Sequence, residues 1–158
     1  MSLVQPHVAI ADLRPICACK NLIAAYASES SSIFESFRHL SGNRISQIPE
    51  TFIGLRLRVL DLSRNHITSL EGLEELSSLE TLNVSGNLIV TYREIRACSR
   101  LVTLDLSSNK IGNLDLVTLT SLNSLKCLYI SGNPIEEYRV AIIAALPSLE
   151  FLDNEFVH

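Results

Sequence analysis

The residues of this chain that are most suited to chemistry are two cysteines and a histidine in its first quarter. Cys17 and Cys19 are two positions apart, so on a β-strand both thiols would point to the same face. His39 follows Cys17 by 22 residues, which is the length of the sequence repeat described below, so it should lie on the neighbouring strand. Thiolate and imidazole bind zinc, and a thiol pair can also exchange with a disulfide. The pattern raises a thiol or metal site as one hypothesis, and two ordinary thiols near the surface as the other.

Other signatures of catalysis are missing from the sequence. It contains no phosphate-binding glycine loop, no dinucleotide fingerprint, no paired-histidine zinc helix and no nucleophile elbow. The histidines are scattered, and none has a neighbour at the spacing of a metal ligand: His7, His39, His66 and His158. We therefore expect a protein that is not an enzyme and that needs no cofactor, metal or small-molecule substrate.

A repeated frame of leucines and asparagines dominates the chain instead. Residues 101–111 read L-x-x-L-x-L-x-x-N-x-I, in which Leu104 and Leu106 face one side of a short strand and Asp105 faces the other. The asparagine of this frame recurs at steps of 22, 22, 22, 22 and 24 residues, at Asn21, Asn43, Asn65, Asn87, Asn109 and Asn133. An amide at each bend can both donate to and accept from backbone groups that a sharp turn leaves unpaired. The asparagines are therefore predicted to be structural.

The segments between the strands predict a thin second layer. Apolar residues fall at every third position there, as in Ile89, Tyr92, Ile95 and Cys98. This spacing suits short 3₁₀ turns better than full α-helices. We expect an α/β solenoid with a curved parallel sheet on its concave face and short helical turns on its convex face. Cys98 should be a buried apolar residue in a reducing compartment.

These residues resemble the short, 22-residue leucine-rich repeat family that is typified by a regulatory subunit of protein phosphatase-1. The end of the chain, with Asn133-Pro134-Ile135, Tyr138-Arg139 and Leu152-Asp153, is similar to a C-terminal cap. The spliceosomal A-prime protein, an axonemal dynein light chain and several small ciliary proteins share that cap. The resemblance covers roughly residues 13–157 and implies that Tyr138 and Arg139 are structural.

One domain of 158 residues is expected, with an N-terminal cap at 1–12, about six repeats at 13–135 and a C-terminal cap at 136–158. In the second repeat Glu35 and Arg38 stand where leucines belong, and a strand shifted or bulged by one residue would let Ile33, Phe34 and Phe37 fill the core instead; both registers stay open from the sequence. The fifth connection, between Asn109 and Asn133, is two residues longer than the others and therefore allows a short helix. A longer α-helix is predicted from Tyr138 to Leu146, ended by Pro147.

Composition limits the partner and the location. With 47% hydrophobic and 19% charged residues the chain can build a continuous core, and its net charge of −4 argues against direct nucleic-acid binding. No signal peptide is recognisable, and the longest apolar run is too short to span a bilayer. We expect a monomeric, cytoplasmic domain without membrane contact, which can belong to a longer chain. Acidic residues Glu71, Glu74, Glu75 and Glu80 are assigned to a solvated convex face.

Function is then expected to reside on the concave sheet, because a ladder of strands presents side chains at fixed spacing. Aromatic residues and arginines anchor interfaces most often. The predicted partner-binding residues are Phe37, His39, Arg58, Asp61, Arg64, Asn83, Asp105, Tyr129 and Phe151. Phe37 and Phe151 could instead only pack near the two caps. The resemblance favours a cytoskeletal, ciliary or flagellar adaptor for a protein partner, and its alternatives are a phosphatase-regulatory or spliceosomal assembly subunit.

Overall fold

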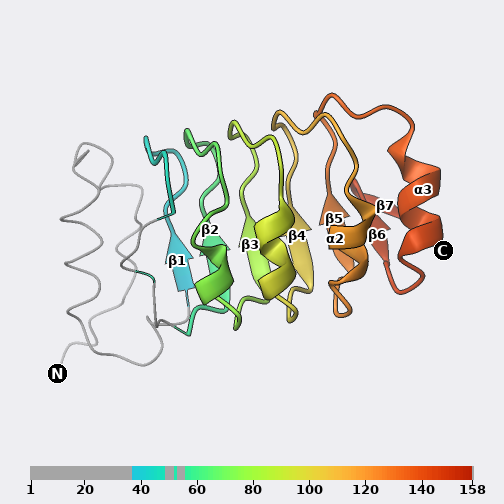
Figure 1. Ribbon diagram of the computed structural model, residues 1–158, viewed down its shortest axis with the longest axis horizontal. Coiled ribbons are helices and arrows are strands. Elements are labelled where there is room, and N and C mark those ends of the chain that lie inside the picture. Colours follow the sequence, from blue (N-terminus) through green and yellow to red (C-terminus); the bar gives the residue numbers. More distant parts are fainter. Residues whose placement is uncertain (1–36, 49–51, 53–55, 158) are drawn as a thin grey trace, which may run out of the picture.

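The computed structural model describes residues 37–48, 52 and 56–157. Its elements alternate along the chain between very short strands and short helices, and the strands stand side by side in a row (Figure 1). In chain order they are β1 Phe37–His39, β2 Val59–Asp61, 3₁₀ helix η4 Leu73–Glu75, β3 Thr81–Asn83, 3₁₀ helix η5 Arg93–Ala97, β4 Thr103–Asp105, α2 Leu116–Thr120, β5 Cys127–Tyr129, α3 Tyr138–Ala145, β6 Phe151–Leu152 and β7 Glu155–Phe156.

The strands form one sheet in sequence order, β1 to β7. Neighbouring strands from β1 to β6 are parallel, and only β6 and β7 pair in antiparallel fashion. The helices cover one face of this sheet (Figure 1). The expected α/β solenoid, with 3₁₀ turns and short helices opposite a parallel sheet, is confirmed.

The second repeat keeps the regular register, without a shift in β1. Arg38 pairs in register with Leu60, in the column that other repeats fill with leucines. It is half-buried, whereas Leu60 is fully buried. A parallel neighbour fixes the register residue by residue, so β1 follows β2 even though an arginine then takes an inward position.

The core is a stack of identical layers. The inward strand residues Leu60, Leu82, Leu104, Leu128 and Leu152 all have an exposed fraction of 0%. Residues at the three-residue spacing between strands, such as Leu73, Ile95 and Cys98, are also fully buried. Burial, followed by the negative charge of Glu74, raises the pKa of the Cys98 thiol to about 11. The prediction that Cys98 is a buried core residue is confirmed.

A ladder of asparagines closes each turn that leaves a strand. Asn87 is 4% exposed; its amide nitrogen donates to the carbonyls of Leu62 at 3.0 Å and Val84 at 2.9 Å, and its oxygen accepts from the Ile67 N–H at 2.9 Å. Asn65 and Asn109 make the same contacts in the adjoining repeats. Each asparagine thus links its own turn to the preceding one. Asn21 lies outside the described residues.

The C-terminal helix α3 begins and ends close to the predicted limits. It covers the last repeat with Ile142, which is fully buried, and it stops one residue before Leu146 because Pro147 follows. Helix α2 occupies the longer fifth connection, where Asp115 caps its N-terminus by accepting from the Thr118 N–H at 3.0 Å. In the described part of the chain, no helix is long and apolar enough to cross a bilayer.

Candidate concave binding face

The name concave face is used below for the sheet surface that points away from the core. Its central column is aligned by strand pairing, with each residue opposite the next along the solenoid: His39, Asp61, Asn83, Asp105 and Tyr129. The flanking column consists of Phe37, Val59, Thr81, Thr103, Cys127 and Phe151. Seven of the nine predicted partner-binding residues therefore lie on this face, counted by strand position.

Three of the polar residues in the central column are already engaged by their own turns. One side-chain oxygen of Asp61 accepts from the Ser63 N–H at 2.9 Å, and Asp105 accepts from Ser107 N–H at 2.9 Å. Asn83 does the same with Ser85 at 3.0 Å. These bonds stabilise the turns at the strand ends. The Asx-x-Ser pattern in the sequence therefore indicates a role in the turn. Asp61 also lies 3.8 Å from His39 Nδ1, which leaves its second oxygen turned to the concave side.

Arg58 was expected on the concave sheet and instead lies just before β2, at the rim where the strands begin. Its guanidinium is held by the Glu80 carboxylate, 2.6 Å away, which stands in the same place before β3. The side-chain hydrogen bond between them raises the pKa of Arg58 and lowers the pKa of Glu80. Lys126 and Glu150 form the same pair at 3.0 Å further along this rim. Glu80 therefore belongs to the rim and not to the convex acidic group.

Arg64 also lies off the sheet, in the turn that follows β2. Its backbone φ is 54°, in the left-handed region. The equivalent turn positions are left-handed as well and are otherwise glycine or serine: Gly42, Gly86, Ser108 and Gly132. The sequence predicted Arg64 on the concave sheet, but β2 ends at Asp61 and Arg64 belongs to the turn that follows it.

Aromatic side chains gather at the C-terminal end of the concave face. Phe151 on β6 and Phe156 on β7 pair directly, with ring centroids 4.3 Å apart. Phe156 is 73% exposed, and Tyr129 is half-exposed on the neighbouring strand. Sequence reasoning missed Phe156, although Asp153 and Asn154 between two short apolar segments indicate a two-residue hairpin. Both have positive φ, at 50° and 68°, as such a turn requires.

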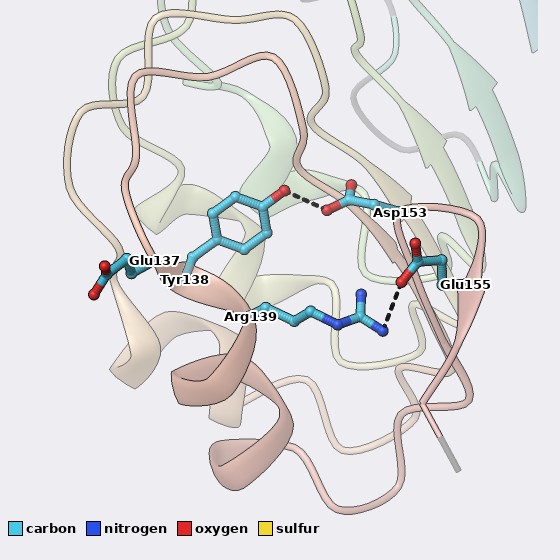
Figure 2. A pocket seen from close by; sticks show the side chains of 5 residues that line it. All are labelled: Glu137, Tyr138, Arg139, Asp153 and Glu155. Carbon is cyan, nitrogen blue, oxygen red and sulfur yellow. Dashed lines mark hydrogen bonds and ion pairs between the residues drawn. The ribbon is translucent and has the colours of Figure 1, made fainter.

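The C-terminal cap carries an open hollow of about 290 Å³, lined by Glu137, Tyr138, Arg139, Asp153 and Glu155 (Figure 2). Tyr138 donates to Asp153 at 2.5 Å, and Arg139 pairs with Glu155 at 3.0 Å. Desolvation, followed by the Asp153 hydrogen bond, raises the pKa of Tyr138 to about 12. Asp153 also accepts from the Ile130 N–H at 2.7 Å, so this cluster fastens the hairpin to β5 and α3. Glu137 points away from it (Figure 2).

The thiol and metal hypothesis depends largely on residues outside this description. Cys17 and Cys19 lie outside the described residues, so their relation to His39 stays a prediction. Within the described ranges, no group of three or more potential ligands could hold a metal ion. Cys127 is a half-exposed free cysteine on the concave face.

Comparisons with known proteins agree with this architecture. A family model described as "Leucine-rich repeat" matches residues 16–158. Mouse leucine-rich repeat-containing protein 36 is 33% identical over 148 residues, covering 88% of this chain and 17% of that protein. The chain therefore spans less than a fifth of the curated relative it matches.

Solved structures show the same fold at lower identity. One is the Drosophila melanogaster SNF/U2A′ complex, with a TM-score of 0.69 and 24% identity, covering 86% of this chain and 84% of the matched one. Another is internalin C2 of Listeria monocytogenes, with a TM-score of 0.70 and 24% identity, covering 90% and 66%. Proteins with this fold generally act as non-enzymatic interaction modules.

Proposed function

The chain belongs to the leucine-rich repeat family, and from this premise we propose that its concave face binds a protein partner through the aromatic cluster at its C-terminal end. The cluster consists of Tyr129, Phe151 and Phe156.

The observation that carries the proposal is an aromatic surface that the core does not need. Leu128 and Leu152, on the inward side of the same strands, are fully buried and complete their layers without help from the aromatics. Phe156 keeps 73% of its surface exposed even though it contacts Phe151. Exposed aromatic side chains on a rigid scaffold are the groups that most often supply binding energy at interfaces.

The rest of the concave face supplies polar recognition. The carboxylates of Asp61 and Asp105 are each bonded on one oxygen to their own turn, and this holds the side chain in place. His39 stands at the other end of the column, with 57% of its side chain exposed. A partner segment laid across the face would meet an apolar end, then hydrogen-bonding and acidic groups, at intervals of about 5 Å.

For the cellular role, the similarity of the cap to small ciliary proteins favours a cytoplasmic adaptor of the cytoskeleton, cilium or flagellum. The likeness to one chain of the SNF/U2A′ complex favours the alternative of an assembly subunit, such as a spliceosomal one. A phosphatase-regulatory role is a further alternative. In each case the concave face binds protein, so one set of variants tests all three.

The experiment is affinity purification of the tagged full chain from its source cells, followed by mass spectrometry and direct binding measurements with the recovered partner. We would compare the wild type with Tyr129→Ala and Phe156→Ser. Both replace exposed or half-exposed side chains, so each should change the free energy of unfolding by only about 0.5 to 1 kcal/mol. Each should weaken partner binding by about tenfold or more, as loss of an interface anchor does.

The matched control is Glu71→Lys with Glu74→Lys, which alters two exposed residues on the convex side. Circular dichroism would verify that every variant is folded. The proposal is wrong if the convex variant loses the partner while both aromatic variants retain it. The identity of the partner, whether a cytoskeletal, splicing or phosphatase protein, decides between the cellular roles.

A further inference from the structure

Four successive asparagine turns stack along one edge of the solenoid, next to the ends of the strands (Figure 1). We call this surface the turn ridge and define it as residues 41–46, 63–68, 85–90 and 107–112. Its backbone is held in place from turn to turn. The N–H groups of His66, Leu88 and Lys110 donate to the carbonyls of Ile45, Ile67 and Ile89 at 2.8 to 2.9 Å. The ridge is therefore a rigid, preorganised surface.

The ridge is basic on a chain that is acidic overall. Arg44, Arg64, His66 and Lys110 are all exposed on it, and its sequence contains no aspartate or glutamate. The nearest carboxylates before two of the turns, Asp61 and Asp105, each direct one oxygen to a backbone N–H. The ridge therefore contains basic residues and no carboxylate of its own, and Asp61 and Asp105 border it at Ser63 and Ser107.

Most cations elsewhere on the described surface are paired, with Arg56 and Arg100 as exposed exceptions. Elsewhere in the described ranges five basic residues have a carboxylate partner within 4.0 Å: Arg58, Arg93, Arg96, Lys126 and Arg139. Among the same described residues, Arg44, Arg64 and Lys110 of the ridge make no such pair. Their charge is thus available to an anionic partner.

The centre of the ridge is apolar. Leu88 is 43% exposed and Val90 57% exposed, and the buried Ile89 between them fixes both outward. Leu88 occupies the same position in its turn as His66 in the preceding repeat and Lys110 in the next. The Arg64 side chain lies beside Gly86, in the turn that carries Leu88; a Cβ at that glycine would stand 3.5 Å from Arg64 Cγ. Arg64 on one side and Lys110 on the other therefore flank an aliphatic centre.

We propose that the turn ridge is a second docking surface, and that it binds an acidic protein segment carrying apolar side chains between its carboxylates. An apolar centre with a charged border is the usual construction of a protein interface. Charge complementarity identifies the partner as acidic, and the aliphatic centre identifies it as protein. A single-stranded nucleic acid would instead be expected to stack its bases on aromatic side chains, and the ridge contains none.

The test uses the full chain and a labelled twelve-residue peptide with two central leucines flanked by glutamates, with fluorescence anisotropy as the readout. We expect saturable binding that weakens with added salt. Arg64→Glu with Lys110→Glu should weaken it by about tenfold or more, and so should Leu88→Ser with Val90→Ser. All four side chains are exposed, so circular dichroism should show folded variants.

A matched double reversal, Arg93→Glu with Arg100→Glu, changes net charge equally on exposed residues away from the ridge. Equal weakening by this control would reduce the effect to overall charge and overturn the proposal, as would the absence of saturable binding. Equal or tighter binding of a labelled single-stranded RNA, insensitive to Leu88 and Val90, would also overturn it. Tyr129→Ala should leave peptide binding unchanged, so failure of the ridge proposal is distinguishable from failure of the concave site.

Discussion

Replacing Asn87 by leucine tests the turn ladder on which the whole stack depends. The side chain is buried, and its oxygen accepts from the Ile67 N–H at 2.9 Å. Its nitrogen donates to Leu62 and Val84, but each of these carbonyls has a second asparagine donor, Asn65 for Leu62 and Asn109 for Val84. The substitution therefore leaves the Ile67 N–H without its acceptor, while the Leu62 and Val84 carbonyls each keep one of their two asparagine donors.

The expected loss of stability follows from the one N–H that is left unpaired and the two carbonyls that each lose one donor. Leaving the Ile67 N–H unpaired inside the stack costs about 1–3 kcal/mol. Each weakened carbonyl adds about 0.5–1.5 kcal/mol. The free energy of unfolding should therefore fall by about 2–6 kcal/mol, a large share of the stability of a domain of this size.

Urea denaturation followed by circular dichroism measures this change. The control is Asn113→Leu, the same substitution at an exposed asparagine outside the ladder, which should alter stability by less than about 0.5 kcal/mol. If both variants unfold at the same urea concentration as the wild type, the asparagines do not hold the turns and the assignment is refuted.

Three further predictions concern the core, the cap and a buried tyrosine. Leu104→Ala, at a fully buried position, should cost about 2–5 kcal/mol in the same denaturation assay through cavity formation. Truncation before Glu136 removes α3 and the hairpin, so it should give aggregation or a lower thermal midpoint; a soluble, monomeric and cooperative product would contradict this. Burial raises the pKa of Tyr92 from 10.0 to about 12, so the folded state holds this proton longer than the unfolded state. Stability present below pH 10 should therefore be lost as the pH rises toward 12, by roughly 2–3 kcal/mol for this group. Tyr92→Phe should show a shallower alkaline loss in denaturant titrations at several pH values, and an unchanged pH slope would count against the shift.

The repeating frame was readable from sequence because it is local and periodic. Each repeat contacts mainly its neighbours, so a residue such as Leu104 meets the same surroundings in every layer. Burial, the 3₁₀ turns and the α3 helix followed from spacing alone. Register comes from pairing with the neighbouring repeat, and this is why β1 keeps the regular frame despite Arg38.

The sites depended on where the chain reverses and on what each charge meets in space. Arg58 and Arg64 have the residue type of interface anchors, but one is paired with Glu80 across the repeat and the other sits in a left-handed turn. Phe156 gained its place on the concave face only through the hairpin with β6. The ion pairs between repeats and the stacking of one turn on the next join residues about 22 positions apart in the sequence. Local periodicity therefore determined the scaffold, and tertiary structure decided which side chains remain free to bind.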